Sequence, residues 1–376
     1  MIKIANLVFN PFVNDSRVIK TSVSLSNNNY EVEVIAHLDK NLKKDERENN
    51  FRVRRFSYLD RNITKSKLKK IQAYLLYLKE SISYCKEFDI LHCNDLDTLP
   101  IGFIIKKFFN KGIKIVYDAH EHESERCHQG NISRNIARIS ERFLLKYVDS
   151  VITVSESIAY EYMKLYGIKK PYLIFNTPNY VSVKKKNIFR EKFAIGEEDT
   201  IFLYQGGLGR GRGILEFADL IKYKKNVVYV IMGYGILENE IKEYASTYNN
   251  IYFHEAVTPD ILLNYTSSAD IGVCIEENLC KSWDYALPNK MFEYHMVGLP
   301  IIVSGLHEMK KFVKENDTGY ILDDIFDKRE FDSKFDMILN TYKSKAKNID
   351  KIVKIYNWEE QEKKLFKLYQ EALSCT

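Results

Sequence analysis

Several patterns that define whole classes of protein are missing from this sequence of 376 residues. Its longest apolar runs, such as VVYVIM at 227–232, are far too short to span a bilayer. The beginning, MIKIANLVF, lacks the long apolar core and cleavage site of a signal peptide. The six cysteines are scattered and form no CxxC pair, which favours free thiols over a disulfide framework or a zinc site. We therefore expect a cytoplasmic protein.

Common ligand-binding motifs are also absent. There is no GK[ST] of a P-loop, and no GxGxxG follows the first expected strand. No HExxH occurs, and the potential ligands in DAHEHESERCH at 118–128 are irregularly spaced for a metal. That stretch leaves a metal site as an alternative, but we expect no metal and no cofactor. The basic residues lack a recognisable nucleic-acid-binding motif, so we expect no nucleic acid partner.

The composition is that of a soluble globular protein, with 45% apolar and 28% charged residues. Its length predicts two domains. Strand-like and helical stretches alternate on both sides of an expected linker, NTPNYVSVKKKN at 176–187. This alternation predicts an α/β fold of two doubly wound, Rossmann-like domains that face a central cleft. The expected strands are 2–9, 31–36, 89–93, 113–120, 150–155, 200–205, 227–232, 250–254, 269–274 and 300–304.

Positive charge is densest at 52–79, within a chain of net charge +5. Helical spacing predicts one inward-packing face, formed by Leu68, Ile71, Leu75, Leu78 and Ile82. The basic side chains that can face an anionic lipid or acceptor are Arg61, Lys65, Lys67, Lys69 and Lys70. The alternative is an ordinary solvated helix surface.

Polar residues follow the expected strands at the end where open parallel sheets bind ligands. Asp15 and Arg17 follow the first strand, Asp95 follows the third, and His120 and Glu121 come at the end of the fourth. Turn chemistry alone also places polar residues at such positions.

The stretch QGGLGRGRGILEF at 205–217 runs from a strand into a helix. Gly206 and Gly207 allow backbone amides to approach a phosphate closely, and the helix N-terminus favours anions. Arg210 and Arg212 add positive charge with forked donors. The stretch indicates an anion site, and a flexible turn is the alternative.

The stretch PNKMFEYHMVGLP at 288–300 reads as a short helix that starts at Pro288 and stops at Gly298. A carboxylate repels phosphate but accepts hydrogen bonds from vicinal sugar hydroxyls. We therefore expect ribose on Glu293 and the diphosphate on the arginines of the glycine-rich stretch. The alternative is a Glu293–Lys290 pair on the helix surface. The groups expected to face the ligand are the amides of Leu287, Asn289 and Lys290 and the carboxylate of Glu293.

Over nearly its whole length the chain resembles glycosyltransferase family 4 enzymes of the GT-B fold. The resemblance implies an acceptor-binding domain over 1–180, a sugar-nucleotide domain over 181–356 and a final helix, 357–373, that crosses back. The donor is usually UDP- or GDP-linked, and we favour a UDP-sugar. The stretches that carry the resemblance are NDSRVIKTSVSLSNNNYEVEVIA, ILHCNDLDTLPIG, VYDAHEHESE, VDSVITVSESIAYEY, FNTPN, YQGGLGRGRG and, most specifically, PNKMFEYHMVGLPIIVS.

The matching motifs imply roles for single residues of the donor domain. Glu293 matches the second glutamate of the family's Glu–seven residues–Glu motif, which holds the ribose. Tyr285 stands in place of the first, which leaves the contacts to the donor sugar open. Arg212 matches the basic residue that binds the diphosphate. The family's other basic residue would fall at Gly207, and Arg210 is expected to replace it.

In the acceptor domain, His120 matches a histidine near the reacting sugar, while Asp15 and Arg17 lie in a loop that lines the family's cleft. The resemblance implies a retaining hexosyl- or N-acetylhexosaminyltransferase that needs no metal, in which the leaving phosphate takes the acceptor proton. The implied acceptor is a glycan or a lipid-linked molecule of bacterial-type surface polysaccharide or glycoconjugate assembly, reached at the inner membrane face. The alternatives are a sugar-nucleotide epimerase or hydrolase of the same architecture, or a non-catalytic sugar-nucleotide-binding subunit.

Overall fold

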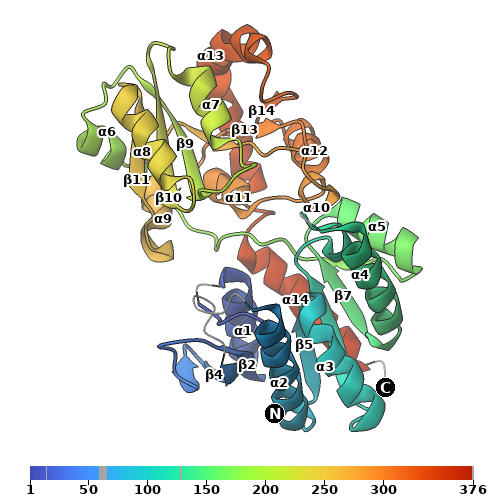
Figure 1. Cartoon of the computed structure of the whole chain (residues 1–376). Coiled ribbons are helices and arrows are strands. Elements are labelled where there is room, and N and C mark those ends of the chain that lie inside the picture. Colours follow the sequence, from blue (N-terminus) through green and yellow to red (C-terminus); the bar gives the residue numbers. More distant parts are fainter. Residues whose placement is uncertain (14, 59–65, 128, 375–376) are drawn as a thin grey trace. The chain divides into compact units, whose positions relative to one another are not determined.

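The computed structural model describes residues 1–13, 15–58, 66–127 and 129–374 (Figure 1). It divides into two compact units: Met1–Phe175 with Gln361–Thr376, and Asn176–Glu360. Both units are α/β structures built on parallel sheets, which confirms the predicted fold class. None of the described helices is long and apolar enough to cross a membrane.

The first unit has an eight-stranded sheet in the order β3-β4-β2-β1-β5-β6-β7-β8. Its neighbours pair in parallel, except that β3 is antiparallel to β4. The central strands are apolar and buried on both faces, as parallel sheets covered by helices require. The strands are β1 (Lys3–Leu7), β2 (Glu31–Leu38), β3 (Asp45–Glu48), β4 (Phe51–Tyr58), β5 (Ile90–Asn94), β6 (Lys114–Ala119), β7 (Ser150–Thr153) and β8 (Tyr172–Leu173).

The helices of the first unit include the last helix of the chain, α14. It packs here through Glu362, which accepts a hydrogen bond from Ser24 Oγ at 2.7 Å. Helices α2 and α3 lie side by side in front of the sheet in Figure 1. The helices are α1 (Ser16–Asn27), α2 (Lys67–Cys85), α3 (Asp95–Phe108), α4 (Asn131–Leu144), α5 (Glu156–Tyr166), α14 (Trp358–Ser374) and the 3-10 turns η1 (Glu123–Glu125) and η2 (Leu145–Tyr147).

Helix α2 packs with a different face from the predicted one. Leu68, Ile71 and Leu75, expected inside, are 79%, 56% and 57% exposed. The buried face instead carries Ala73 and Tyr77, with Ser81 and Cys85 one and two turns further on. The Tyr77 hydroxyl lies 3.1 Å from two carbonyl oxygens, that of Val8, directly after β1, and that of Ile35 in β2, so the tyrosine anchors the helix to the sheet. Arg61 and Lys65 lie outside the described residues, as does the side chain of Lys67.

The second unit has a six-stranded parallel sheet in the order β11-β10-β9-β12-β13-β14. Its buried core includes Phe202 from the sheet and Phe217 and Phe331 from two helices that cover it. The elements are β9 (Thr200–Gly207), β10 (Val227–Tyr234), β11 (Ile251–Glu255), β12 (Ile271–Cys274), β13 (Ile301–Ser304), β14 (Gly319–Leu322), α6 (Ile188–Phe193), α7 (Ile214–Ile221), α8 (Glu238–Thr247), α9 (Pro259–Thr266), α10 (Lys281–Asp284), α11 (Asn289–Met296), α12 (His307–Asn316) and α13 (Lys328–Ile352).

All ten expected strands are present, and β3, β4, β8 and β14 are additional. Strand β4 alternates inward-facing Phe51, Val53 and Arg55 with outward-facing residues. Because Arg55 is buried and its guanidinium donates to the carbonyl oxygens of Pro11 and Lys43, a charged residue occupies a core position and hides the alternation.

Candidate active site

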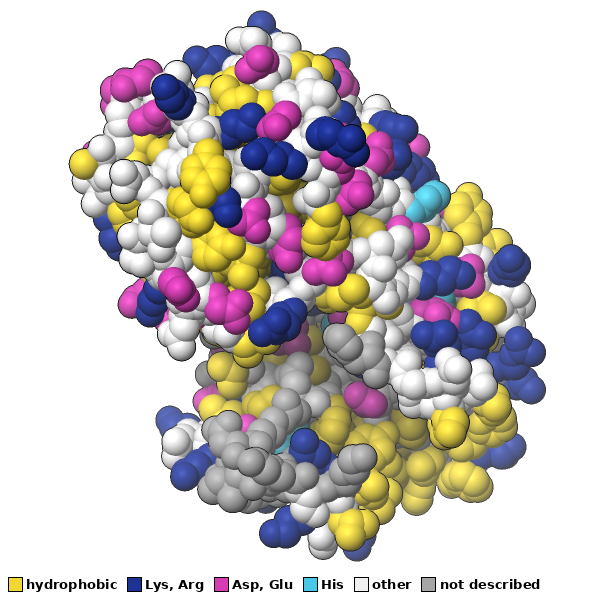
Figure 2. Space-filling view, turned by 45° about the horizontal axis from the view of Figure 1, so that its top comes forward, with side chains coloured by type: hydrophobic (Ala, Val, Ile, Leu, Met, Phe, Trp, Pro, Cys, Tyr) yellow, Lys and Arg dark blue, Asp and Glu magenta, His cyan; other side chains and the backbone are white. Residues whose placement is uncertain are grey.

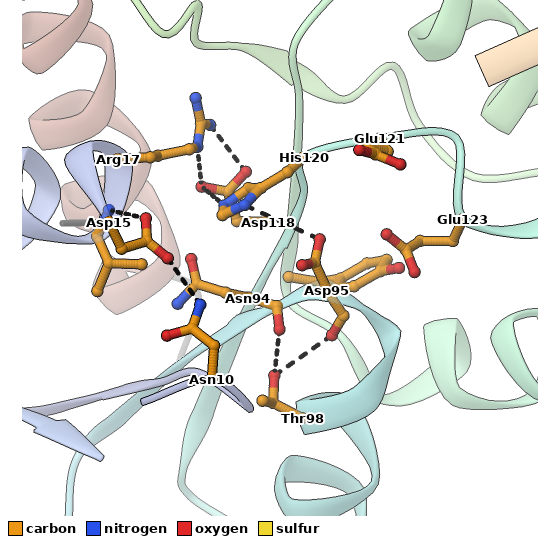
Figure 3. Close-up of polar contacts among 12 residues, drawn as sticks. Asn10, Asp15, Arg17, Asn94, Asp95, Thr98, Asp118, His120, Glu121 and Glu123 are labelled. Atoms are coloured by element: carbon orange, nitrogen blue, oxygen red, sulfur yellow. Dashed lines mark hydrogen bonds and ion pairs between the residues drawn. The ribbon is translucent and has the colours of Figure 1, made fainter. Parts of the chain in front are cut away.

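In the first unit, an ion pair lies at the carboxyl end of the sheet (Figure 3). Arg17, in the first turn of α1, donates from Nε and Nη2 to the two carboxylate oxygens of Asp118, each at 2.8 Å. Arg17 is 4% exposed and Asp118, in β6, is 1% exposed. Burial raises the pKa of Asp118, but Arg17 and His120 together bring it well below the ordinary range. Asp118 is therefore a buried carboxylate that is charged at neutral pH.

His120 is held beside this pair. Its Nε2 lies 3.5 Å from Asp118 Oδ2, and its Nδ1 lies 3.9 Å from Asp95 Oδ1 (Figure 3). The side chain is 20% exposed, so one part of the ring remains accessible. Burial lowers the pKa of His120, but Asp118 and Asp95 outweigh this effect and raise the pKa above its usual value.

A second histidine connects Asp118 to the last helix of the chain. His92 Nε2 lies 3.3 Å from Asp118 Oδ2, and His92 Nδ1 lies 2.7 Å from the Tyr369 hydroxyl of α14. Both residues are fully buried. Burial lowers the pKa of His92, although the hydrogen bond to Asp118 acts in the opposite direction. Helix α14 thus completes a buried network that reaches His120 through Asp118.

The other residues predicted on the acceptor side have different surroundings. Asp15 caps α1: its Oδ1 accepts from Val18 N at 3.2 Å, and its Oδ2 accepts from Asn10 Nδ2 at 2.9 Å. Asp95 starts α3 with a φ of 59° and lies 3.5 Å from Arg126 Nη2. Glu121 is 53% exposed and lies 3.4 Å from Arg126 Nε. The structure therefore links His120, Asp95 and Glu121 in one network that includes Arg126. Asp15 is the N-cap of α1 and has a structural role.

In the second unit, the glycine-rich stretch leaves the end of β9 as predicted. Gly206 has a φ of 124°, which favours glycine. Gly206 and Gly207 are both exposed, and a Cβ at either position would meet no atom within 4 Å. At Gly211 a side chain would instead collide with Leu279 and Trp283. An open backbone surface therefore precedes a tightly packed turn.

Arg212 and Lys290 converge on one carboxylate oxygen. Arg212 Nη1 donates to Glu276 Oε1 at 2.9 Å, and Lys290 Nζ lies 3.5 Å from the same atom. The Arg212 guanidinium lies 5.5 Å from the Trp283 ring centroid, and Lys290 Nζ lies 4.4 Å from that of Tyr204. Glu276 is 4% exposed. Two cations therefore share one buried anion, which leaves a net positive charge at this place.

Arg210 is not part of this cluster. Its side chain is 76% exposed, and Nη2 lies 3.4 Å from Glu240 of α8. A surface pair of this kind holds a side chain only weakly.

Helix α11 forms where the sequence predicts it, with Pro288 as the N-cap and Gly298 at a φ of 81° after its end. Glu293 Oε2 accepts a hydrogen bond from Gln205 Nε2 at 2.6 Å. Lys290 is only 6% exposed, so it does not lie on the helix surface, where the alternative Lys290–Glu293 pair would place it. Burial lowers the pKa of Lys290, but Cys274, Tyr204 and Glu276 outweigh this and raise it. Lys290 is therefore a buried cation.

The remaining donor-side residues border this helix. Tyr285 is half-buried, with its ring centroid 5.7 Å from that of His307 and 5.3 Å from Lys281 Nζ. Leu287 is half-buried and Asn289 is exposed. Within the described part of the chain, no group of three or more His, Cys, Asp or Glu side chains is placed to hold a metal ion, and His128 lies outside that part.

Sequence reasoning gave no role to three residues that organise these sites. Asp118 holds Arg17 and His120, and Glu276 holds Arg212 and Lys290. Gln205 donates to Glu293 and accepts from Thr266 Oγ1 at 2.7 Å. Asp118, Gln205 and Glu276 each lie at or just after the end of a strand, which is the signal that would have found them.

Comparisons with known proteins agree with this architecture. Residues 17–177 match the family model of Glycosyltransferase Family 4, and residues 185–355 match that of Glycosyl transferases group 1. No curated protein sequence matches.

Solved structures are similar over the full length. Sucrose-phosphate synthase from Thermosynechococcus elongatus has a TM-score of 0.82 and 17% identity, with 100% of both chains covered. HepE from Anabaena, in complex with UDP and glucose, has a TM-score of 0.73 and 12% identity, covering 98% of this chain and 100% of its own. An E. coli structure described as trehalose-6-phosphate bound with UDP-2-fluoro glucose has a TM-score of 0.72 and 10% identity, covering 98% and 99%. At these identities the likeness shows a shared fold.

Proposed function

Because the chain is a glycosyltransferase of the GT-B type, we propose that it transfers a hexosyl or N-acetylhexosaminyl group from a UDP-sugar, with retention of the anomeric configuration. HepE binds UDP and glucose, and the E. coli structure binds UDP-2-fluoro glucose, which supports a uridine nucleotide. The proposed acceptor is a glycan or a lipid-linked molecule in bacterial-type surface polysaccharide or glycoconjugate assembly. The proposed location is the cytoplasm, including the inner face of the membrane.

The observation that carries the proposal is the arrangement around the end of β9. Two cations, Arg212 and Lys290, flank the buried Glu276. Gln205 of the same strand donates to Glu293. In the proposed complex the Glu293 carboxylate accepts hydrogen bonds from the ribose hydroxyls, and the diphosphate binds at Arg212. The amides of Gly206, Gly207, Leu287 and Asn289 add donors, and Arg210 and Tyr285 close the donor site.

The chemistry follows from where charge develops. As the bond from the anomeric carbon to the diphosphate breaks, negative charge grows on the leaving phosphate. Fixed cations aimed at that position stabilise the transition state, which is commonly the largest catalytic effect. In the proposed same-face reaction the acceptor oxygen attacks the anomeric carbon, and the leaving phosphate takes the acceptor proton. No step requires a metal or a cofactor.

In the first unit, we assign His120 to orienting the donor sugar. Asp118 and Asp95 favour its imidazolium form, which donates from both ring nitrogens. Arg17 is buried and bound to Asp118, so it acts through Asp118. Asp95 and Glu121 are 28% and 53% exposed and are proposed to contact the acceptor, while Asp15 caps the start of α1.

Product analysis tests this function against its alternatives. The purified chain is incubated with a UDP-sugar, with and without a lipid-diphosphate acceptor fraction. A transferase gives a glycosylated acceptor and UDP only when acceptor is present. A new nucleotide sugar formed without acceptor would indicate an epimerase, and free sugar would indicate a hydrolase. Binding of UDP-sugar without any turnover would identify a non-catalytic subunit.

A further inference from the structure

Helix α4 exposes a row of large apolar side chains. Ile132, Ile136, Ile139 and Phe143 recur at helical spacing and are 78%, 59%, 71% and 46% exposed. Single exposed apolar residues are ordinary, but a continuous row along one helix marks an interaction surface. We call these four residues the α4 row.

The opposite face of α4 is unusually polar. Glu141, the one acidic residue of this helix, is fully buried and accepts hydrogen bonds from the hydroxyls of Tyr117, Tyr162 and Tyr166 at 2.7, 2.5 and 2.5 Å. Glu125, on η1, forms ion pairs with Arg134 and Arg138 of the helix. The helix is thus attached to the unit by polar contacts and turns its isoleucines to the solvent, the reverse of an ordinary surface helix.

The α4 row continues into an aromatic cluster at the end of α3. The Phe143 ring lies 5.1 Å from that of Phe103, which lies 6.4 Å from that of Phe108. Phe108 is 69% exposed. Hydrophobic side chains gather on the side of the first unit that carries α3 and α4, at the lower right of Figure 2.

The charge pattern selects the partner. Of the three arginines of helix α4, Arg134 and Arg138 pair with Glu125, and Arg142 is exposed. Lys107 and Lys146, near the Phe143 end of the row, are also exposed, and the exposed face of the helix has no acidic residue. An apolar row with exposed basic side chains and no exposed acidic one is typical of a helix that lies in the interface of an anionic bilayer. A stable dimer buries about 800 Å² per partner over some 20–30 residues, which is more than the four side chains of the row and the phenylalanines beside them. The occupant that fits is a lipid surface.

We propose that α4 is a membrane-docking helix, whose row enters the headgroup region of an anionic bilayer while Arg142, Lys107 and Lys146 contact lipid phosphates. This inference deepens the proposed function, since it rests on that function for the lipid-linked acceptor that docking would bring within reach. The main apolar contact with the membrane is then made by α4, which lies outside the basic segment at 52–79.

The test measures binding to phosphatidylcholine vesicles with and without phosphatidylglycerol, by sedimentation. The variant Ile132→Gln/Ile136→Gln/Ile139→Gln removes the row, and we expect its affinity for anionic vesicles to fall roughly a hundredfold or more. The matched control, Tyr223→Gln/Phe326→Gln/Met337→Gln, removes three exposed apolar side chains of the second unit and should bind like the wild type. Circular dichroism verifies that both variants are folded.

A single substitution gives an independent readout should the triple variant fold poorly. In Ile139→Trp, the emission of the added tryptophan is obtained by subtracting the wild-type spectrum. With anionic vesicles this emission should shift to the blue and be quenched by brominated lipid chains. The proposal would be overturned if the triple variant bound anionic vesicles as tightly as the wild type, or if the wild type did not bind them. A concentration-dependent dimer that the triple variant abolishes, without vesicle binding, would assign the row to a second copy. No assay here uses a nucleotide sugar, so failure of docking and failure of transferase activity are distinguishable.

Discussion

Arg17 and Asp118 form a bidentate ion pair, with two hydrogen bonds of 2.8 Å, in the buried carboxyl edge of the first sheet. Breaking such a pair by removing one partner typically costs about 3–5 kcal/mol, because the remaining charge stays buried. The pair also fixes the carboxylate beside which His120 lies, at 3.5 Å. A structural ion pair and a candidate active-site histidine thus share one aspartate.

Replacing Asp118 should change the titration of His120. In Asp118→Asn the neighbouring negative charge is lost, so we expect the pKa of His120 to fall from its raised value. The imidazolium form would then be lost at lower pH, and any activity that needs it would decline at lower pH than in the wild type. An NMR titration of the imidazole signals measures this. An unchanged His120 pKa in the folded variant would show that Asp118 does not govern it.

The same aspartate predicts how stability depends on pH. Because the pKa of Asp118 is well below its ordinary value, its stabilising contribution is present above the unfolded-state pKa and is lost as the pH falls through the folded-state pKa. Urea unfolding of wild type and Asp118→Asn at decreasing pH should therefore converge in acid. Parallel stability curves down to strongly acidic pH would contradict the assignment.

Glu293→Gln should weaken binding of a UDP-sugar while the fold is retained. Loss of a hydrogen bond to a charged group costs about 1.5–3 kcal/mol, and calorimetric titration measures it. Glu191→Gln, the same change at an exposed position of α6, is the matched control. Equal donor affinity in wild type and folded Glu293→Gln would remove Glu293 from the ribose site.

Arg212→Ala should lower kcat more than it weakens donor binding, because the proposed phosphate charge grows only in the transition state. Arg210→Ala should have a smaller effect, since that side chain is 76% exposed and lies beside Glu240. Steady-state kinetics with varied donor separate the two effects. If both variants only raise the donor KM, the arginines are binding groups and the proposed charge stabilisation loses its support.

Lys69 and Lys70 of α2 are exposed and should add electrostatic attraction to an anionic membrane. Each basic residue near such a surface is worth about 1 kcal/mol, so Lys69→Glu/Lys70→Glu should weaken vesicle binding at low salt and leave donor affinity unchanged. The predicted difference shrinks as salt is added. Vesicle binding that is equal in both proteins at low salt would make this segment an ordinary solvated surface.

The sheets were predictable because strand–helix alternation and apolar runs fix parallel α/β architecture locally. Strand β4 was not, since Arg55 occupies a core position that periodicity assigns to an apolar residue. The inward face of α2 was mistaken because Tyr77 and Ala73, not the leucines, meet the sheet.

The positions of Arg212 and Glu293 near the end of β9 were predictable, because both side chains stand in a glycine-rich or helix-start motif. The organising residues of the candidate site were not, because their partners are distant in sequence. Glu276 meets Arg212 and Lys290 only once β12 lies beside β9. Tyr369 reaches His92 only because the last helix returns to the first unit.

A thermal-shift screen with UDP-sugars and GDP-sugars tests the proposed donor chemistry most directly. A ligand that binds only the folded state stabilises it by about 2.7 kcal/mol at a hundredfold excess over its Kd. We expect at least one UDP-sugar to raise the Tm of the wild-type chain, with a much smaller rise in Glu293→Gln. If no UDP- or GDP-sugar raises the Tm of the folded wild type, the assignment of the site around Arg212, Lys290 and Glu293 to a nucleotide sugar is contradicted.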